Sequence, residues 1–166
     1  ANGLREPYTI TVGQILALPG NAGRVQTARA APPRRIDPAL PARTPGRFAW
    51  PVRGQVVSDF GPKPGGLHND GINIRVAQGS PVLAADAGVV AYVGNQLRGF
   101  GNLMLIRHDG GWVTAYAHNE ALLVARGARV ERGQIVARAG STGNVEEPQL
   151  HFEIRRGTVA VDPREH

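Results

Sequence analysis

Residues 103–116, LMLIRHDGGWVTAY, predict an antiparallel pair of strands. Two apolar and β-branched runs flank the turn signal Asp109-Gly110-Gly111, and this arrangement is typical of a β-hairpin. We therefore expect strands at 103–107 and 112–116 that pair with each other.

The sequence around this hairpin has the same texture from Phe48 onward, with short β-branched runs separated by glycines. We predict six further strands, at 55–57, 72–74, 82–84, 88–93, 134–139 and 150–155. Residues 121–126 could form one helical turn or another strand. Because aromatic residues make up only 5% of the 166 residues and there are 22 glycines, the core should consist of Val, Ile, Leu and Ala between many turns. The predicted fold class of residues 48–166 is all-β, with an antiparallel sheet.

Upstream of this domain, residues 21–47 are rich in Pro, Ala and Arg and show no sustained period of 2 or 3.6. Such a composition predicts a semi-extended linker. Residues 1–20 contain a short alternation of apolar residues that is too small to bury a core alone. The start at Ala1 without Met suggests a trimmed fragment, so the lack of a signal peptide says little about location.

Composition excludes several classes of function. The formal charge is +6, but Lys63 is the only lysine and the arginines are scattered, so there is no basic stripe for nucleic acid. No apolar run approaches the roughly 20 residues of a membrane span. Without cysteine, any zinc site would need His, Asp or Glu ligands.

Residues 68–73, HNDGIN, look like a metal-binding motif but carry few good ligands. If their strand lay beside the strand at 150–155, the side chains of Asn69, Asn73, Gln149 and His151 could converge on one spot. Amide oxygens bind zinc far more weakly than imidazole or carboxylate, so the residues themselves predict no tight metal and no cofactor. We interpret His108, at a strand end beside a turn, as a structural histidine.

These residues resemble the LytM-type (lysostaphin-like) zinc endopeptidases of bacterial cell walls. Their pattern is His-x-Gly-x-Asp, then Tyr-Ala-His, then His-Leu-His-Phe-Glu. The resemblance implies that the family has a ligand histidine where this chain has Asn69 and a ligand aspartate where it has Asn73. It also implies a catalytic histidine in the family at the position of Gln149. It retains the ligand His151 and the second catalytic histidine, His118. Residues 1–20 are similar to the closing half of a LysM peptidoglycan-binding repeat.

The resemblance implies a catalytically degenerate LytM domain of the kind found in bacterial cell-division regulators. Such domains bind and activate peptidoglycan hydrolases, namely amidases and lytic transglycosylases, in the periplasm at the division septum. Long loops would then form a docking groove for the partner. We expect its residues to be Asn69, Asn73, Leu97, Arg98, Phe100, His118, Gln149 and His151. Two alternatives remain: an active peptidase using a rearranged site of His68, Asp70 and His151, or a passive peptidoglycan-binding module.

Overall fold

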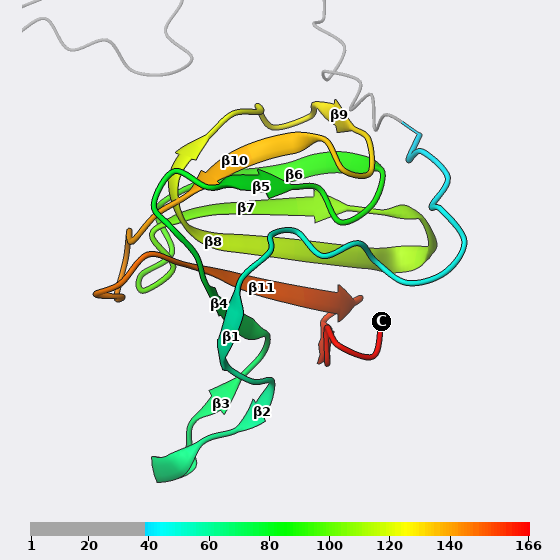
Figure 1. Cartoon of the computed structure of the whole chain (residues 1–166). Coiled ribbons are helices and arrows are strands. Elements are labelled where there is room, and N and C mark those ends of the chain that lie inside the picture. Colours follow the sequence, from blue (N-terminus) through cyan, green and yellow to red (C-terminus); the bar gives the residue numbers. More distant parts are fainter. Residues whose placement is uncertain (1–38) are drawn as a thin grey trace, which may run out of the picture. The chain divides into compact units, whose positions relative to one another are not determined.

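The computed structural model describes residues 39–166 (Figure 1). The predicted LysM remnant at 1–20 and the linker up to residue 38 lie outside the described residues. No helix in the described part of the chain is long and apolar enough to cross a membrane.

Residues 55–161 form an antiparallel sheet of ten strands, and two short strands form a separate hairpin. The path of the large sheet is β1-β4-β11-β8-β7-β6-β9, with β10 pairing β5 and β8 and with β12 pairing β11. The ten strands are β1 (Gln55–Ser58), β4 (Ile72–Arg75), β5 (Pro81–Leu83), β6 (Gly88–Gly94), β7 (Asn102–Arg107), β8 (Trp112–Leu122), β9 (Arg129–Val130), β10 (Ile135–Ala139), β11 (Gln149–Arg156) and β12 (Val159–Val161).

The all-β fold and the eight predicted strands are confirmed, including the β7–β8 hairpin. The turn between these two strands contains a short 3-10 stretch, Asp109–Gly111, where Gly110 and Gly111 both have positive φ. Residues 121–126 divide between the end of β8 and a turn. Sequence analysis missed β9 and β12, which are short strands at the margins of the sheet.

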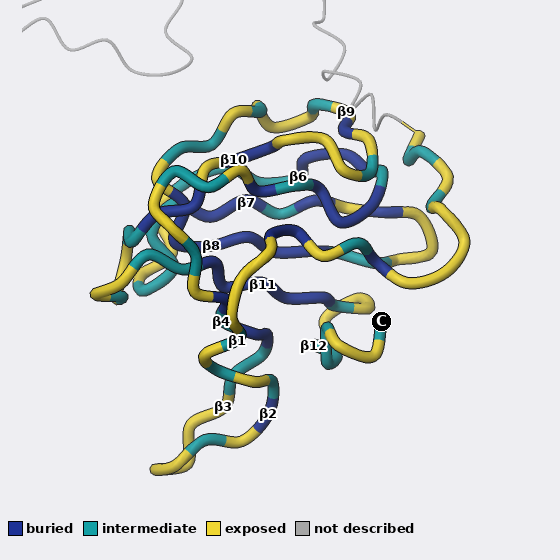
Figure 2. The backbone as a smooth tube through the Cα atoms, viewed as in Figure 1, coloured by how far each residue is buried: buried dark blue, intermediate teal, exposed yellow. Residues whose placement is uncertain are grey.

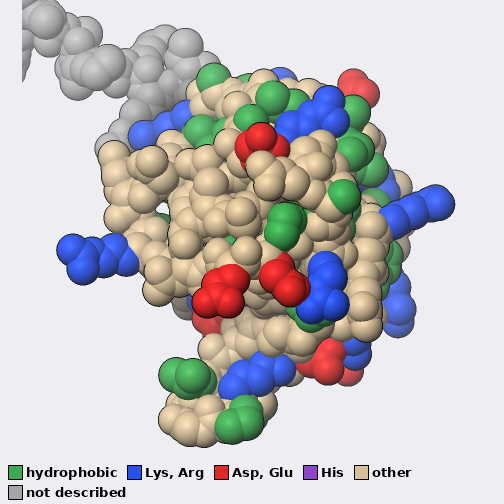
Figure 3. Space-filling view, turned by 60° about the vertical axis from the view of Figure 1, so that its left-hand side comes forward, with side chains coloured by type: hydrophobic (Ala, Val, Ile, Leu, Met, Phe, Trp, Pro, Cys, Tyr) green, Lys and Arg blue, Asp and Glu red, His purple; other side chains and the backbone are tan. Residues whose placement is uncertain are grey.

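The missed hairpin consists of β2 (Gly61–Pro62) and β3 (His68–Asn69), which carry no apolar alternation. It projects from the domain, and Figure 2 shows that most of it is exposed. Leu67, near the tip, is 70% exposed. In the space-filling view the hairpin is the projection at the bottom, with hydrophobic and basic side chains on its surface (Figure 3).

The two faces of the sheet bury different sets of residues because side chains alternate along each strand. Leu150, Phe152 and Ile154 of β11 point into the main core, together with residues of β4, β7, β8 and β10. The opposite face of β7 and β8 carries a smaller apolar cluster of Leu103, Ala115 and Ala117. On β11 the residues that alternate with the core positions are Gln149, His151, Glu153 and Arg155.

The described end of the predicted linker, residues 39–47, contacts the sheet domain. Arg43 Nε donates to the fully buried carboxylate of Asp86 at 2.9 Å, and the Thr44 N–H donates to the same carboxylate at 3.2 Å. The Arg43 guanidinium also lies 4.0 Å from the centre of the Phe48 ring. The Phe48 N–H then donates to the carbonyl of His166 at 2.7 Å.

Candidate functional site

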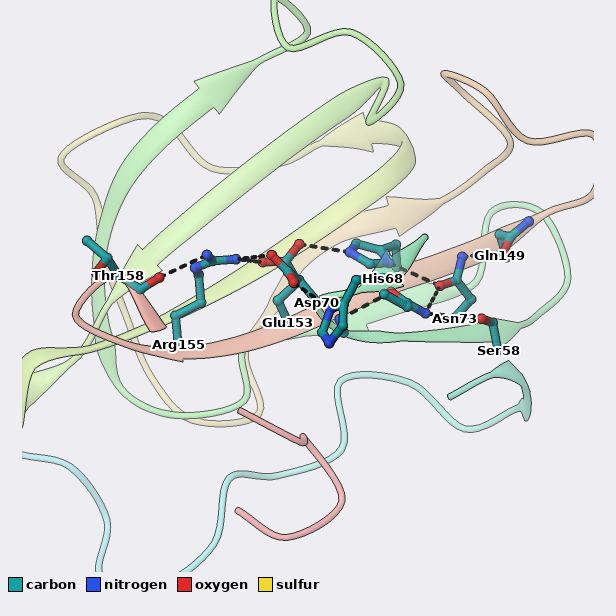
Figure 4. Close-up of polar contacts among 11 residues, drawn as sticks. Ser58, His68, Asp70, Asn73, Gln149, Glu153, Arg155 and Thr158 are labelled. Carbon is teal, nitrogen blue, oxygen red and sulfur yellow. Dashed lines mark hydrogen bonds and ion pairs between the residues drawn. The ribbon is translucent and has the colours of Figure 1, made fainter. Parts of the chain in front are cut away.

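The sheet brings together the residues that sequence analysis placed in one site. β4 and β11 pair with His151 opposite Asn73, which confirms that the two strands are neighbours. Asn69 lies at the end of β3, and its amide reaches Asn73 at 3.0 Å and the Ser58 hydroxyl of β1 at 3.1 Å. Asn73 in turn contacts Gln149 at 2.8 Å (Figure 4).

Gly71 permits this convergence because the chain turns tightly against β11 at that position. A Cβ on Gly71 would lie 2.2 Å from the carbonyl oxygen of Phe152, so any side chain there would force the strands apart. The glycine of the HNDGIN motif is therefore required by the close approach of two strands.

The three amide side chains form a head-to-tail chain of hydrogen bonds, which we call the amide relay: Asn69, Asn73 and Gln149. It begins at the Gly71 N–H, which donates to Asn69 Oδ1 at 3.2 Å. Asn69 Nδ2 donates to Asn73 Oδ1, and Asn73 Nδ2 donates to Gln149 Oε1. The relay ends where Gln149 Nε2 approaches the Glu147 carbonyl at 3.4 Å. Because a backbone donor begins it and a backbone acceptor ends it, the orientation of all three amides is determined.

This orientation places an oxygen acceptor opposite one nitrogen of His151. Its Nδ1 lies 3.1 Å from Asn73 Oδ1, and that oxygen already receives the Asn69 amide. His151 Nδ1 is therefore occupied by its contact with Asn73. The other nitrogen, Nε2, lies 2.9 Å from Glu153 Oε1.

The buried carboxylate of Glu153 contacts His151 at Nε2, the ring nitrogen that does not face Asn73. Glu153 Oε2 accepts a hydrogen bond from Arg155 at 2.6 Å, and Arg155 also reaches Asp70 at 3.2 Å. Burial alone would raise the pKa of Glu153, but the hydrogen bonds and charges of His151 and Arg155 outweigh it and lower this pKa below its usual value. Glu153 therefore stays ionised at neutral pH.

His68 faces away from the relay and is about half exposed. Its Nδ1 lies 3.0 Å from Asp70 Oδ1, and its ring packs edge-on against Phe60. Across the described residues 39–166, no group of three or more His, Cys, Asp or Glu side chains is arranged to hold a metal ion. His68, which sequence analysis named with Asp70 and His151 as a rearranged site, lies in the short strand β3.

His118 lies where β8 changes partner. Residues up to Ala117 pair with β11, and those from Asn119 onward pair with β10. At the junction His118 has a φ of 64°, and it is the one non-glycine residue with positive φ among the described residues. This backbone conformation costs a β-carbon-bearing residue about 1–2 kcal/mol.

Hydrogen bonds to two loops hold His118 in place. Its backbone N–H donates to Phe100 O at 2.8 Å, and its Nδ1 donates to Thr142 O at 2.8 Å. Burial lowers the pKa of His118, the bond to Thr142 raises it and nearby His151 lowers it, with a net shift below the usual value. The ring is therefore neutral at pH 7, with Nε2 unprotonated.

The donor set does not fit a zinc ion. Asn69 and Asn73 offer neutral amides whose oxygens already accept hydrogen bonds, and both ring nitrogens of His151 lie within hydrogen-bonding distance of protein oxygens. Tight zinc sites need imidazole lone pairs, thiolates or carboxylates. No metal-dependent step can be derived from these residues.

The predicted docking residues differ in how accessible they are. Leu97 and Arg98 are exposed on the loop before β7. The three relay residues are partly buried, whereas His118 and His151 are 6% and 8% exposed. Phe100 is partly buried against the Leu103, Ala115 and Ala117 cluster, and its ring centre lies 5.8 Å from that of His151.

His108, interpreted from sequence as structural, is fully buried. Its Nδ1 lies 2.7 Å from Ala87 O and its Nε2 lies 2.8 Å from the Thr114 hydroxyl. Sequence analysis missed the parts of the site that depend on pairing across strands. Ser58, Thr142 and Arg155 gave no signal, although Glu153 stands in the His-Phe-Glu run that was used for the resemblance.

Comparison with known proteins assigns the fold to a family. The pattern of peptidase family M23 matches residues 67–163, which is more than half of the chain. The chain belongs to peptidase family M23. The match covers the relay, His118 and His151.

The relatives of this M23 domain include proteins of cell division and lipoproteins. It is 46% identical over 144 residues to cell division protein DipM of Caulobacter vibrioides, covering 87% of this chain and 23% of DipM. It is 41% identical to the uncharacterized lipoprotein YgeR of Escherichia coli, covering 98% of this chain and 68% of YgeR. The murein hydrolase activator NlpD of the same organism is 44% identical over 116 residues, which cover 70% of this chain and 30% of NlpD.

Solved structures show the same fold. A zinc-containing peptidase from Vibrio cholerae superposes with a TM-score of 0.65 and 33% identity, over 71% of this chain and 39% of the peptidase. The catalytic domain of lysostaphin from Staphylococcus simulans superposes with a TM-score of 0.62 and 30% sequence identity, over 68% of this chain and 90% of that domain. The lysostaphin-like fold predicted from the sequence is confirmed.

Proposed function

We propose that this M23 domain is a non-catalytic activator of peptidoglycan hydrolases that acts during cell division and septal wall remodelling in the periplasm. The observation that carries the proposal is the amide relay: the two positions that the resemblance assigns to metal ligands hold amides, and both ring nitrogens of His151 contact protein oxygens. A metallopeptidase needs a metal-bound water as nucleophile, and these residues offer no metal site to bind one.

The relatives support the activator role over other non-catalytic roles. NlpD is named as a murein hydrolase activator and DipM as a cell division protein, and both match the M23 region at more than 40% identity. Activation requires contact with a hydrolase, such as an amidase or a lytic transglycosylase. We propose that the contact surface is the docking face, made of Asn69, Asn73, Leu97, Arg98, Phe100, His118, Gln149 and His151.

The test is stimulation of a purified amidase or lytic transglycosylase on isolated peptidoglycan. Asn73→Arg places a charge within the relay, and Phe100→Ala removes an aromatic contact beside His151. Each should weaken hydrolase binding by about 1–3 kcal/mol if these are docking contacts. Circular dichroism must first show that each variant is folded.

Two matched controls make similar changes at exposed residues outside the docking face. Val159→Arg adds the same charge at a residue that is 65% exposed, and Leu123→Ala removes an apolar side chain that is 52% exposed. Both should stimulate as well as the parent chain. If the folded docking-face variants also stimulate normally while a control change abolishes the effect, the docking face is wrongly assigned.

The same assay separates the two alternative functions. Turnover of cross-linked peptide by the chain alone, abolished by His118→Ala or His151→Ala, would indicate a residual peptidase. Binding to peptidoglycan without an effect on any hydrolase would indicate a passive wall-binding module. Under the proposal, the chain and both histidine variants are equally inert on peptidoglycan.

A further inference from the structure

A cavity of about 820 Å³ lies outside the docking face. It opens between the segment that leads into β1 and the start of β5. Its lining is largely apolar, and the side chains that matter here are Trp50, Val52, Arg53, Val56, Pro81 and Leu83. None of the lining residues belongs to the amide relay. Its volume is within the range of about 300–1,000 Å³ that is typical of binding pockets.

The lining exposes apolar surface that a soluble domain normally covers. Trp50 is 51% exposed, and Pro81 is also exposed, whereas Val52 at the floor is 7% exposed and belongs to the main core. Aromatic side chains at the edge of an apolar cavity are common anchors for a partner chain.

Strand β1 borders this cavity and has a free edge. It pairs with β4 on one side, and no strand within residues 39–166 pairs with its other side. Gly54 and Val56 connect the two features, because both line the cavity and stand immediately before or within β1. An open strand edge offers backbone N–H and C=O groups to an added strand.

Charge indicates the chemistry of the occupant. Arg53 is exposed at the cavity and makes no ion pair within the described residues, and the lining contains no Asp or Glu. The nearby Arg75 is different, because it already pairs with Glu147 at 2.9 Å. A carboxylate on a partner chain bound at the cavity would complement the unpaired positive charge of Arg53.

We propose that the cavity and the free edge of β1 together bind an extended segment of a partner protein. The segment adds a strand to β1, inserts an apolar side chain beside Trp50 and Leu83, and places an acidic side chain near Arg53. This second docking surface goes beyond the activator function, because it needs neither a hydrolase nor the docking face.

The test is selection of random octapeptides, displayed on phage, on the purified chain. Enriched peptides should alternate apolar and polar residues and carry at least one Asp or Glu. A synthetic copy of the most enriched peptide should bind in solution, measured by fluorescence anisotropy, and slow the hydrogen exchange of backbone amides in β1.

Variants then locate the binding site. Arg53→Glu and Trp50→Ser should each weaken the peptide by about tenfold or more. The matched controls Arg126→Glu and Leu123→Ser change exposed residues outside the cavity and should bind as the parent does. A peptide with Lys in place of its acidic residue should regain affinity for Arg53→Glu, which a folding defect could not produce.

The proposal is overturned if no peptide is enriched above a control selection on beads without the protein, or if the enriched peptides lack acidic residues. It is equally overturned if both cavity variants bind like the parent. Arg53→Glu and Trp50→Ser should still stimulate the hydrolase as the parent does, so failure of this proposal is distinct from failure of the activator function.

Discussion

Asn69 and Asn73 stand at the two positions that the family resemblance assigns to metal ligands. Asn73 and His151 face each other across paired strands, and Asn69 lies within hydrogen-bonding distance of Asn73. Restoring the donors at these positions should therefore restore binding without altering the fold.

The double variant Asn69→His with Asn73→Asp should retain about one equivalent of zinc after dialysis, because it presents two good donors beside His151. Zinc at 100 times its Kd should stabilise the variant by about 2.7 kcal/mol. Elemental analysis and thermal melting measure both effects, with the parent chain and Asn95→His with Asn144→Asp as controls. Equal zinc in all three proteins would contradict the prediction.

His118 makes the stability of the fold depend on pH near neutrality. Because its folded pKa is lowered, the folded state binds a proton less readily than the unfolded state, whose pKa is about 6.5. The stabilisation is complete above pH 6.5 and is lost as the pH falls below it. His108 has a lowered pKa through burial and acts in the same direction.

The variant His118→Asn should lose less stability than the parent between pH 7.5 and pH 5.5. Asparagine tolerates positive φ and its amide can still donate to Thr142 O, so stability at pH 7.5 should change little. One histidine contributes at most about 1.4 kcal/mol per pH unit. Urea unfolding at the two pH values measures the difference. An identical pH dependence in parent and variant would show that His118 is not a source of it.

Among the structural elements, the segment at 39–48 is the least expected part of the folded domain. Its composition predicts a semi-extended linker, and Arg43 within it pairs with a carboxylate that has no exposed surface. Burial would raise the pKa of Asp86, but the hydrogen bonds from Arg43, Thr44 and Ala87 lower it. The ion pair therefore stabilises the fold above about pH 3.8 and is lost as the pH falls through the folded pKa.

Arg43→Ala should destabilise the domain by about 1–3 kcal/mol at pH 7, because a buried carboxylate loses a charged donor. Arg47→Ala is the matched control: its one hydrogen bond, to Arg164 O, is 3.5 Å long, so the expected cost is below about 0.5 kcal/mol. The difference should shrink as the pH falls below about 3.8. Equal costs for the two variants would mean that the segment is not held by Asp86.

Considered together, the elements enclose an apolar core. Ile72, Ile74, Met104, Tyr116 and Ile154 are fully buried in it, and it contains neither the relay residues nor His118 or His151. The midpoint of thermal unfolding should therefore be the same in a chelator as in micromolar zinc. A large decrease on chelation, measured by circular dichroism, would show that an ion contributes to the fold.

The sequence predicted the sheet because apolar alternation is a local signal that a window of a few residues contains. The convergence of Asn69, Asn73 and Gln149 could also be predicted, since Gly71 lies between the first two and Leu150 follows the third in motifs that resemble a known family. The hydrogen-bond partners of these side chains could not, because they depend on a relay that spans three strands and ends on the backbone. The contact of Arg43 with Asp86 was equally hidden, since 43 residues separate the partners.

The hydrogen bond between Phe48 and His166 has a topological consequence. It places the two ends of the sheet domain side by side, and His166 packs against Trp112, which pairs with Arg156 at the finish of β11. The relay residue Gln149 stands at the opposite end of that strand. A circular permutant that joins residue 166 to residue 43 through a short glycine bridge, and opens the chain between Gly65 and Gly66, should therefore fold. A fusion at residue 166 would leave the relay end of the sheet unobstructed.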